Sequence, residues 1–383
     1  MKFLSNKDVL AQAVIFVTKL LTQKSTNPTL AGVRIDAIDK GVMLSTLDND
    51  VSTRITIEAE VETPGSVLVS GKLLTEIATR LPGDTVSINL EESKLHVISA
   101  NAKFNLSIMP LNEYPNLPEL PEIIGSFDGE KFSEAISQVG VAALKEDGSP
   151  AIQNIFFEIF ENEISFTATD RFRIASRNIS WKASGAAKEE QVLIPARVLI
   201  EAGKMFQTAT EVSLGLLAGG EREIISIQAG TKIVTSSLAK GSFPKVKALL
   251  DEKGAGSYAI VLASDLVDAT KRVSLVTENR ETAIHFVFSE SGVLVETGSG
   301  EKASASETVP AHLVGEEISV WLKPKFVVDG VSCAHSEFVR LGFTPALESG
   351  KAGPVMVTAH SSKDSVDVQR DYRYLMQPNL LQR

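Results

Sequence analysis

The chain has 383 residues, of which 43% are hydrophobic and 6% aromatic, and its formal net charge is −10. This length can bury two or three cores, which must be mostly aliphatic. The negative charge excludes a protein that binds nucleic acid through its whole surface. The single cysteine, Cys333, excludes a disulfide framework and suits a reducing cytoplasm. No apolar run approaches the roughly 18 residues of a membrane span, so we expect no membrane partner.

The first predicted element is an amphipathic helix near the N-terminus. Its apolar stripe runs from Val9 to Leu21, with Ser5 as the candidate N-cap and Asp8 three residues further on. Gln12 interrupts the apolar stretch and charged residues precede it. The segment is therefore typical of a helix in a folded domain and not of a signal peptide.

The next pattern, two alternating strands joined by a short turn, occurs three times. The paired segments are Val33–Ala37 with Val42–Thr46, Ile155–Ile159 with Ile164–Ala168, and Ile284–Phe288 with Val293–Thr297. Their spacing exceeds the about 20–50 residues of solenoid repeats. It predicts three tandem copies of one whole domain, an arrangement suited to building a symmetric assembly.

The rest of each copy can be aligned on these hairpins. An amphipathic helix precedes each hairpin, with Asp128 and Ser264 before the second and third of these helices. A second helix follows each hairpin and is marked by the apolar pairs Leu73-Leu74, Val198-Leu199 and Phe326-Val327. Further strands are predicted in the first copy at Val86–Leu90, Lys94–Ser99 and Phe104–Ile108. The predicted fold class is α+β, with two helices packed on antiparallel sheets in each domain.

Shifts in composition mark the joins between the three domains. Pro115–Pro121 is a proline-rich linker that neither a helix nor a central strand could use. Asp251–Ser257 has the composition of a flexible join. The predicted domains are therefore residues 1–121, 122–252 and 253–383.

Motifs for catalysis, metals or cofactors are weak. Gly298–Ala303 fits the loose dinucleotide fingerprint, but Ser304–Pro310 does not open a helix whose N-terminus would hold a pyrophosphate. The five histidines are dispersed, and Cys333 with His335 alone does not make a zinc site. We therefore predict a protein that is not an enzyme and that holds no metal or cofactor.

Lysine and arginine recur at equivalent helices of the three copies. Each alone is an ordinary solvated residue. Their recurrence favours a basic surface that attracts phosphates while the remainder of an acidic protein repels them. No base-reading arrangement accompanies them, so contact with double-stranded DNA would be independent of sequence. The predicted DNA-binding residues are Lys24, Lys72, Arg80, Arg197, Lys204, Lys271 and Arg272.

An ordered set of short segments carries a family resemblance. They are Asn27–Gly32, Arg80–Pro82, Tyr114–Asn116, Thr167–Asp170 with Arg173-Ile174, Gly241–Pro244 and Tyr374–Leu381. Together with the threefold repeat, this set resembles that of bacterial DNA polymerase III beta subunits, the sliding clamps, over nearly the whole chain. The resemblance implies a cytoplasmic homodimer, a ring of six DNA-clamp domains that encircles double-stranded DNA and tethers polymerases for processive synthesis.

The resemblance also implies a hydrophobic pocket between the second and third domains. In the family it receives short linear motifs of the replicative polymerase alpha subunit, the clamp loader, and repair and translesion polymerases. The matching residues are Ile152, Thr169, Arg173, Ile174, Pro244, Leu249, Pro354, Leu375, Met376, Pro378 and Asn379. Arg173 is expected to donate hydrogen bonds to the peptide, and apolar side chains of the pocket are expected to be partly exposed.

This chain departs from the family pattern at the pocket. Arg171-Phe172 stands where Gly-His is usual, Ala248 where an arginine is common, and Gln377–Leu381 where the tail is Met-Pro-Met-Arg-Leu. We expect the pocket to be present, with a preferred motif that these changes can shift. The Lys145–Pro150 segment also lacks the aromatic residues that some members carry near DNA.

Two other classes remain open. An α+β enzyme on a triplicated scaffold would have a pocket with clustered, perturbed titratable groups, and the sequence offers none. A peptide-binding scaffold unrelated to DNA would lack a positively charged helical surface. Open sheet edges favour the ring, since pairing the last domain of one copy with the first of another, twice, removes them.

Overall fold

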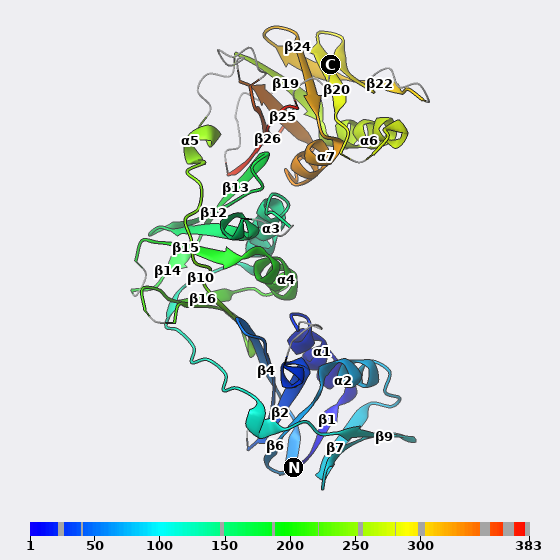
Figure 1. Ribbon diagram of the computed structural model, residues 1–383, viewed down its shortest axis with the longest axis vertical. Coiled ribbons are helices and arrows are strands. Elements are labelled where there is room, and N and C mark those ends of the chain that lie inside the picture. The colour runs from blue at the N-terminus through cyan, green and yellow to red at the C-terminus, as the bar shows by residue number, and fades with distance from the viewer. Residues whose placement is uncertain are drawn as a thin grey trace. The chain divides into compact units, whose positions relative to one another are not determined.

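A computed structural model of the chain (Figure 1) describes residues 1–21, 27–39, 41–145, 149–185, 188–220, 222–251, 256–279, 281–297, 303–344, 353–362 and 371–379. The chain divides into two compact units. Unit 1 comprises Met1–Ser133, Trp181–Lys188 and Arg197–Leu238, and unit 2 comprises Glu134–Ser180, Glu189–Ala196 and Ala239–Arg383.

Unit 1 contains two antiparallel sheets. The strand order of the first is β5 (Glu60–Thr63), β1 (Lys2–Asn6), β7 (Thr85–Glu91), β8 (Lys94–Ser99) and β9 (Ala102–Ser107). The order of the second is β14 (Lys182–Ala183), β10 (Ile123–Phe127), β16 (Val212–Leu217), β17 (Ile224–Ala229), β18 (Lys232–Ser237), β4 (Val51–Ile57), β3 (Gly41–Leu47), β2 (Gly32–Ile38) and β6 (Gly65–Ser70).

The second sheet is continuous across the first two sequence repeats because β18 pairs with β4. In this pairing Thr235 lies opposite Ser52. Their hydroxyl oxygens are 2.6 Å apart and both residues are buried. The two hydroxyls therefore satisfy each other inside the joint, as buried polar groups must.

The helices of unit 1 are α1 (Lys7–Thr18), α2 (Gly71–Ala78) and, from Arg197 onward, α4 (Ala196–Phe206). α1 begins after Asn6, whose side-chain oxygen accepts the backbone N–H groups of Asp8 and Val9 at 2.9 and 3.2 Å. The predicted cap, Ser5, is wrong by one residue, because the side chain that accepts the N–H groups of the first turn is that of Asn6. The apolar face of α1 is buried through Leu10, Ala13, Val14, Phe16 and Val17.

Unit 2 also contains two antiparallel sheets. The order of the larger one is β15 (Glu190–Pro195), β11 (Asn154–Ile159), β12 (Glu163–Thr169), β13 (Arg173–Ser180), β27 (Tyr372–Met376), β26 (Val355–His360), β25 (Phe338–Phe343), β19 (Ser257–Leu262) and β23 (Ala311–Val314). The smaller one has the order β22 (Ser306–Val309), β21 (Gly292–Glu296), β20 (Ile284–Ser289) and β24 (Ile318–Leu322). The pairing of β13 with β27 joins the second and third repeats in one sheet.

The helices of unit 2 are α3 (Gly129–Gly140) from Glu134 onward, α5 (Lys247–Leu250), α6 (Ala263–Val273) and α7 (Pro324–Ser332). Single 3₁₀ turns are η1 (Pro28–Ala31), η2 (Leu111–Glu113), η3 (Pro150–Gln153) and η4 (Ser274–Val276). Asp128 accepts the N–H of Lys131 at 3.0 Å and so starts α3 as predicted. Ser264 lies inside the first turn of α6 and does not cap it.

The repeated hairpins are confirmed as β2–β3, β11–β12 and β20–β21. A helix pair accompanies each, so the predicted α+β class with antiparallel sheets is confirmed. Residues 298–302 of the dinucleotide-like segment lie outside the described ranges, and β22 follows it in place of a helix. In the part of the chain that the structure describes, every helix is too short or too polar to cross a membrane.

Candidate functional site

Four buried apolar side chains of unit 2 form a cluster where three strands meet a short helix. They are Ile174 in β13, Leu250 in α5, Met356 in β26 and Leu375 in β27. Ile174 lies opposite Leu375, and Leu375 lies opposite Met356. Residues opposite each other on paired strands share a face, so three of the four side chains form one apolar row.

Two large apolar side chains near this row remain exposed. Leu249, next to Leu250 in α5, and Phe172, just before β13, are each 55% exposed. The name apolar patch is used below for Phe172, Ile174, Leu249, Leu250, Met356 and Leu375. Exposed apolar side chains that adjoin a buried cluster are typical of surfaces that bind other proteins or peptides.

Ion pairs at both ends hold α5 in place. The Lys247 ammonium lies 2.6 Å from the carboxylate of Glu158, a side chain that is 6% exposed. At the other end, Asp251 lies 3.9 Å from the Arg373 guanidinium. A helix of one turn is not stable by itself. The position of Leu249 therefore depends on these contacts and on the packing of α5 against β27.

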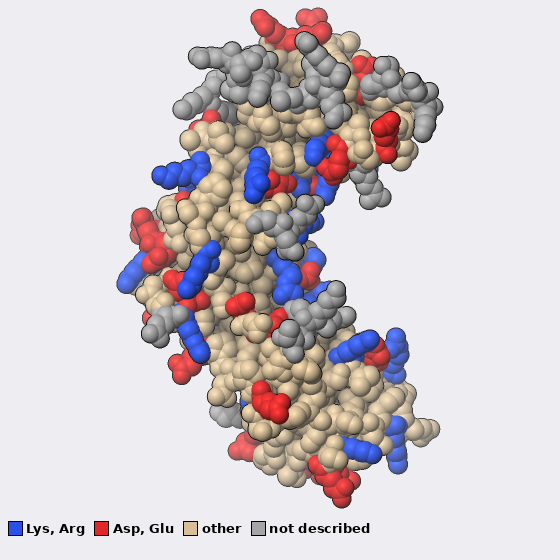
Figure 2. Space-filling view, viewed as in Figure 1, with Lys and Arg blue, Asp and Glu red and all other residues tan. Residues whose placement is uncertain are grey.

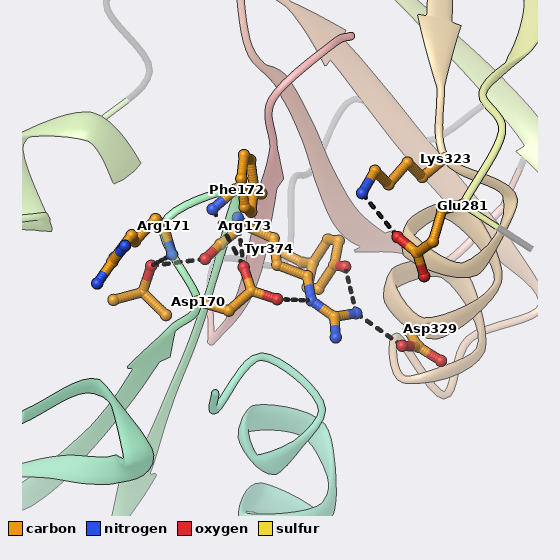
Figure 3. Close-up of polar contacts among 9 residues, drawn as sticks. Asp170, Arg171, Phe172, Arg173, Glu281, Lys323, Asp329 and Tyr374 are labelled. Carbon is orange, nitrogen blue, oxygen red and sulfur yellow. Dashed lines mark hydrogen bonds and ion pairs between the residues drawn. The ribbon is translucent and has the colours of Figure 1, made fainter. Parts of the chain in front are cut away.

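A buried arginine links β13 to α7 and β27, as Figure 3 shows. The Arg173 guanidinium donates to Asp170 at 2.8 Å, to Asp329 at 2.6 Å and to the Tyr374 hydroxyl at 3.3 Å. It also lies 4.6 Å from the centre of the Phe326 ring. Burial by itself would lower the pKa of Arg173, but Tyr374, Asp329 and Asp170 raise that pKa above its ordinary value.

The structure shows how Arg173 is held within unit 2, and its contact with a bound peptide stays a prediction. Its side chain is 4% exposed, and its donors serve Asp170, Asp329 and Tyr374. Through these contacts Arg173 fixes the strand that carries Ile174 against the third repeat.

The remaining predicted pocket residues surround the patch or support it from inside unit 2. Ile152, Thr169, Met376 and Pro378 are buried, Pro354 and Asn379 are half-buried, and Pro244 is exposed. The Thr169 hydroxyl donates to the carbonyl of Arg173 at 2.7 Å, which closes the turn before β13. The Asn379 N–H donates to the carbonyl of Trp321 at 2.8 Å and so ties the segment after β27 to β24.

Three patch residues were missed by sequence reasoning. The sequence did carry a signal for Leu250. Val246 and Leu250 are four residues apart, the spacing of one helical turn, and in the structure Val246 packs against the cluster that contains Leu250. Met356 lies in a strand whose six residues are all buried, so no alternation marks it. Phe172 was noted only as a departure from the family pattern.

The described DNA-binding cations predicted in unit 1 are exposed on its helices or just after one. Lys72 lies in α2, Arg80 two residues after it, and Arg197 and Lys204 in α4. Lys24 lies outside the described residues. Figure 2 shows lysine and arginine side chains on the surface of each unit, with acidic side chains between them.

Contacts between α1 and α4 bring cations of the first two repeats together. The Phe16 and Phe206 rings meet edge to face with centres 6.1 Å apart. Glu201 lies 2.8 Å from Lys204 and 3.7 Å from Lys19. One carboxylate thus faces two ammonium groups, so these three residues together carry a net positive charge.

The two cations predicted in unit 2 lie in the last turn of α6 and differ in their surroundings. Both Lys271 and Arg272 are exposed. Arg272 donates to both carboxylate oxygens of Glu307, at 2.9 and 2.6 Å, so its charge is matched within the protein. Lys271 is therefore the stronger candidate for contact with phosphate.

The described residues offer no candidate metal site. No group of three or more His, Cys, Asp or Glu side chains in these ranges is placed to hold a metal ion.

Three domains of the DNA polymerase III beta subunit match the chain in order. The N-terminal domain matches residues 1–118, the central domain residues 126–245 and the C-terminal domain residues 253–366. The chain belongs to the DNA polymerase III beta subunit family. The domain limits predicted from composition, at residues 121 and 252, stay predictions.

Individual sliding clamps resemble the chain over nearly its whole length. The beta sliding clamp of Streptomyces coelicolor is 34% identical over 385 residues, which cover 99% of each chain. That of Micrococcus luteus is 38% identical over 313 residues, which cover 82% of this chain and 100% of the relative. The crystal structure of the sliding clamp from Bacillus subtilis has a TM-score of 0.88 at 24% identity and covers 100% of this chain and 99% of that chain. The predicted class, three tandem clamp domains of a DNA sliding clamp, is confirmed, and a scaffold unrelated to DNA is not favoured.

Proposed function

We propose that two copies of this chain close into a cytoplasmic ring around double-stranded DNA, and that the apolar patch tethers polymerases to it. The observation that carries the proposal is the match of three consecutive clamp domains together with a relative, a beta sliding clamp, that is 34% identical over 99% of the chain. A free thiol at Cys333 suits the cytoplasm. The chain tethers partners and catalyses no step itself.

Ring closure uses two sheet edges. β9 ends the first sheet of unit 1, and β22 ends the smaller sheet of unit 2, so neither has a second strand partner among the described residues. Beside β22, Glu307 binds Arg272 of α6, and Leu275, directly after α6, is 81% exposed. Pairing β9 of one copy with β22 of the other, twice, covers both edges and Leu275.

Sedimentation velocity at micromolar concentration tests the ring. We expect a sedimenting species with twice the 41.2 kDa mass of one chain. The Leu275→Asp variant should sediment as a monomer. Leu217→Asp is the matched control, because Leu217 is also exposed, at 50%, but lies in β16, which belongs to neither of the two sheets that supply these edges. A wild-type monomer at every concentration would overturn the closed ring.

DNA contact is assigned to exposed cations of the helices. Changing Lys72, Arg197 and Lys271 together to Glu removes one cation from each repeat. We expect this triple variant to reduce retention of the loaded ring on circular DNA and to flatten its salt dependence, since each lost phosphate contact removes counterion release. A control triple variant at Lys182, Arg222 and Lys240, which lie outside the helices, should leave retention unchanged.

If both triple variants are retained equally on circular DNA, the helical cations are ordinary solvated surface residues and do not contact DNA. Linearised DNA supplies the second control. A ring held by topology slides off a free end, whereas a protein bound to phosphates is retained on both forms.

Partner binding is assigned to the apolar patch. Leu249→Asp places a charge on a side chain that is already exposed, so the fold should persist while the affinity for polymerase-derived peptides falls at least about tenfold. Leu217→Asp again serves as control. Unchanged affinity of Leu249→Asp for every such peptide would contradict the assignment.

A further inference from the structure

The turn Asp170–Arg173, between β12 and β13, is firmly held although its backbone is unfavourable for the residue it carries. Asp170 Oδ1 accepts the N–H groups of Phe172 and Arg173, each at 3.1 Å. The N–H of Arg171 donates to the Thr169 hydroxyl at 3.2 Å. Arg171 has a φ of +80°, in the left-handed region that favours glycine. The turn therefore carries a large side chain at Arg171, where glycine would be the easier choice, and a second one at Phe172.

Phe172 is fixed through its backbone and open along its ring. Its carbonyl accepts the N–H of Gln377 at 2.8 Å, which extends the pairing of β13 with β27. The ring lies 5.4 Å from the Lys323 ammonium, which Glu281 holds at 2.7 Å (Figure 3). More than half of the side chain remains exposed. The ring is thus a preformed apolar surface, two residues from Ile174 of the patch.

The charges around this ring are unequal. The carboxylates of Asp170 and Glu281 are used internally, by Arg173 and Lys323 respectively. Arg171 is exposed and forms no ion pair with any residue in the described ranges, and Figure 3 shows its side chain extending away from the Arg173 network. An aromatic surface with an available guanidinium one residue away favours a ligand that is both apolar and negatively charged.

We propose that Arg171 and Phe172 determine which peptides the apolar patch accepts. The favoured occupant is a segment of a partner protein whose aromatic side chain packs on Phe172 and whose neighbouring carboxylate pairs with Arg171. The Gly-His of the family pattern would supply neither a permanent cation nor a phenyl ring at these positions. The inference rests on the proposed function of the patch as the partner-binding surface.

Fluorescence anisotropy with four short synthetic peptides tests the pair. The parent peptide carries a leucine anchor, a phenylalanine and an aspartate. In the others the phenylalanine becomes leucine, the aspartate becomes asparagine, or both change. On the unchanged protein we expect each single change to weaken binding about tenfold. In the Phe172→Ala variant, the difference in affinity between the phenylalanine and leucine peptides should fall to about twofold. In the Arg171→Gly variant, the difference in affinity between the aspartate and asparagine peptides should likewise fall to about twofold.

Leu217→Ala and Arg222→Ala are matched controls and should keep both affinity differences. Phe172→His, which retains a ring, should keep part of the aromatic preference, and near-ultraviolet circular dichroism checks the fold of each variant. If the unchanged protein binds all four peptides equally, or if both differences survive in the variants, the inference is overturned while the patch stands. If no peptide binds the unchanged protein and Leu249→Asp changes nothing, the proposed function fails with it.

Discussion

The two units join successive repeats through the same backbone geometry and different side chains. In unit 1 the turn after β3 leads into β4, which pairs with β18, and in unit 2 the turn after β12 leads into β13, which pairs with β27. One backbone hydrogen bond at each joint has a counterpart at the other joint. The Ser237 N–H donates to the carbonyl of Asp50 at 2.7 Å in unit 1, and the Gln377 N–H donates to that of Phe172 at 2.8 Å in unit 2.

The side chains at these matched positions differ in polarity, and this difference closes one joint and leaves the other partly exposed. Ser52 and Thr235 satisfy each other as buried hydroxyls, whereas Ile174 and Leu375, at the equivalent positions, belong to the apolar patch. The repeated backbone fixes where a joint lies. The side chains decide whether the joint is closed to partners, as in unit 1, or is left with exposed apolar neighbours, as in unit 2.

The largest effect should come from the charged residue of the second joint. Arg173→Met leaves Asp170 and Asp329 without their partner, and breaking a buried pair in this way costs about 3 kcal/mol of unfolding free energy. Val51 occupies the matched position of the first joint, and Val51→Ala should cost about 1 kcal/mol. Urea denaturation followed by circular dichroism measures both. Equal costs would show that the ion pairs of Arg173 do not hold the second joint.

The next effect separates packing from partner binding. Leu375→Ala removes buried methyl groups and should destabilise unit 2 by about 2–3 kcal/mol while weakening peptide binding about tenfold. Ser52→Ala leaves Thr235 unpaired and should cost about 1 kcal/mol. The serine variant should bind peptide as the unchanged protein does. A loss of peptide affinity in Ser52→Ala would mean that the two joints are coupled and that the contrast drawn here is incomplete.

A smaller effect concerns α5, the helix that contributes Leu249 to the patch. Lys247→Met leaves the buried carboxylate of Glu158 without its ammonium partner, which should cost about 1–2 kcal/mol of unfolding free energy. Peptide affinity should still fall about threefold, because Leu249 loses its fixed position. Lys240→Met, an exposed lysine outside α5, is the control. Unchanged peptide affinity in Lys247→Met would show that the Glu158 pair does not position the patch.

Local patterns were sufficient for the repeated hairpins and failed where distant residues decide the outcome. Strand alternation and turn composition are properties of adjacent residues, so Val33–Ala37 and its two counterparts could be found. Either Ser5 or Asn6 could cap α1, and the choice depends on where the pairing of β1 with β7 ends, at Asn6 opposite Thr85, which the sequence does not show.

The same limit applies at the site. The resemblance identified Arg173 as a pocket residue, but its ion pair with Asp329, which lies in another repeat, could not be found from adjacent residues. Leu249 and Leu250 are adjacent and chemically identical. Only the positions of Met356 and Leu375 decide that Leu250 is buried and Leu249 exposed.

The smallest effect is expected at the turns themselves and has opposite signs in the two joints. Arg171→Gly removes a side chain from a left-handed backbone position, a relief of about 1–2 kcal/mol, which the greater freedom of unfolded glycine reduces to a net gain of about 0.5 kcal/mol. Asn49 holds the matched place in unit 1 and is not among the described residues with positive φ. Asn49→Gly gains no relief and should lose about 0.5–1 kcal/mol. Urea midpoints measure the pair, and a loss in both variants would show that Arg171 is unstrained. Arg171→Gly should also weaken binding of the aspartate-containing peptide. Stability and peptide affinity are therefore expected to change in opposite directions at this one residue, as happens where a strained conformation is kept for a function.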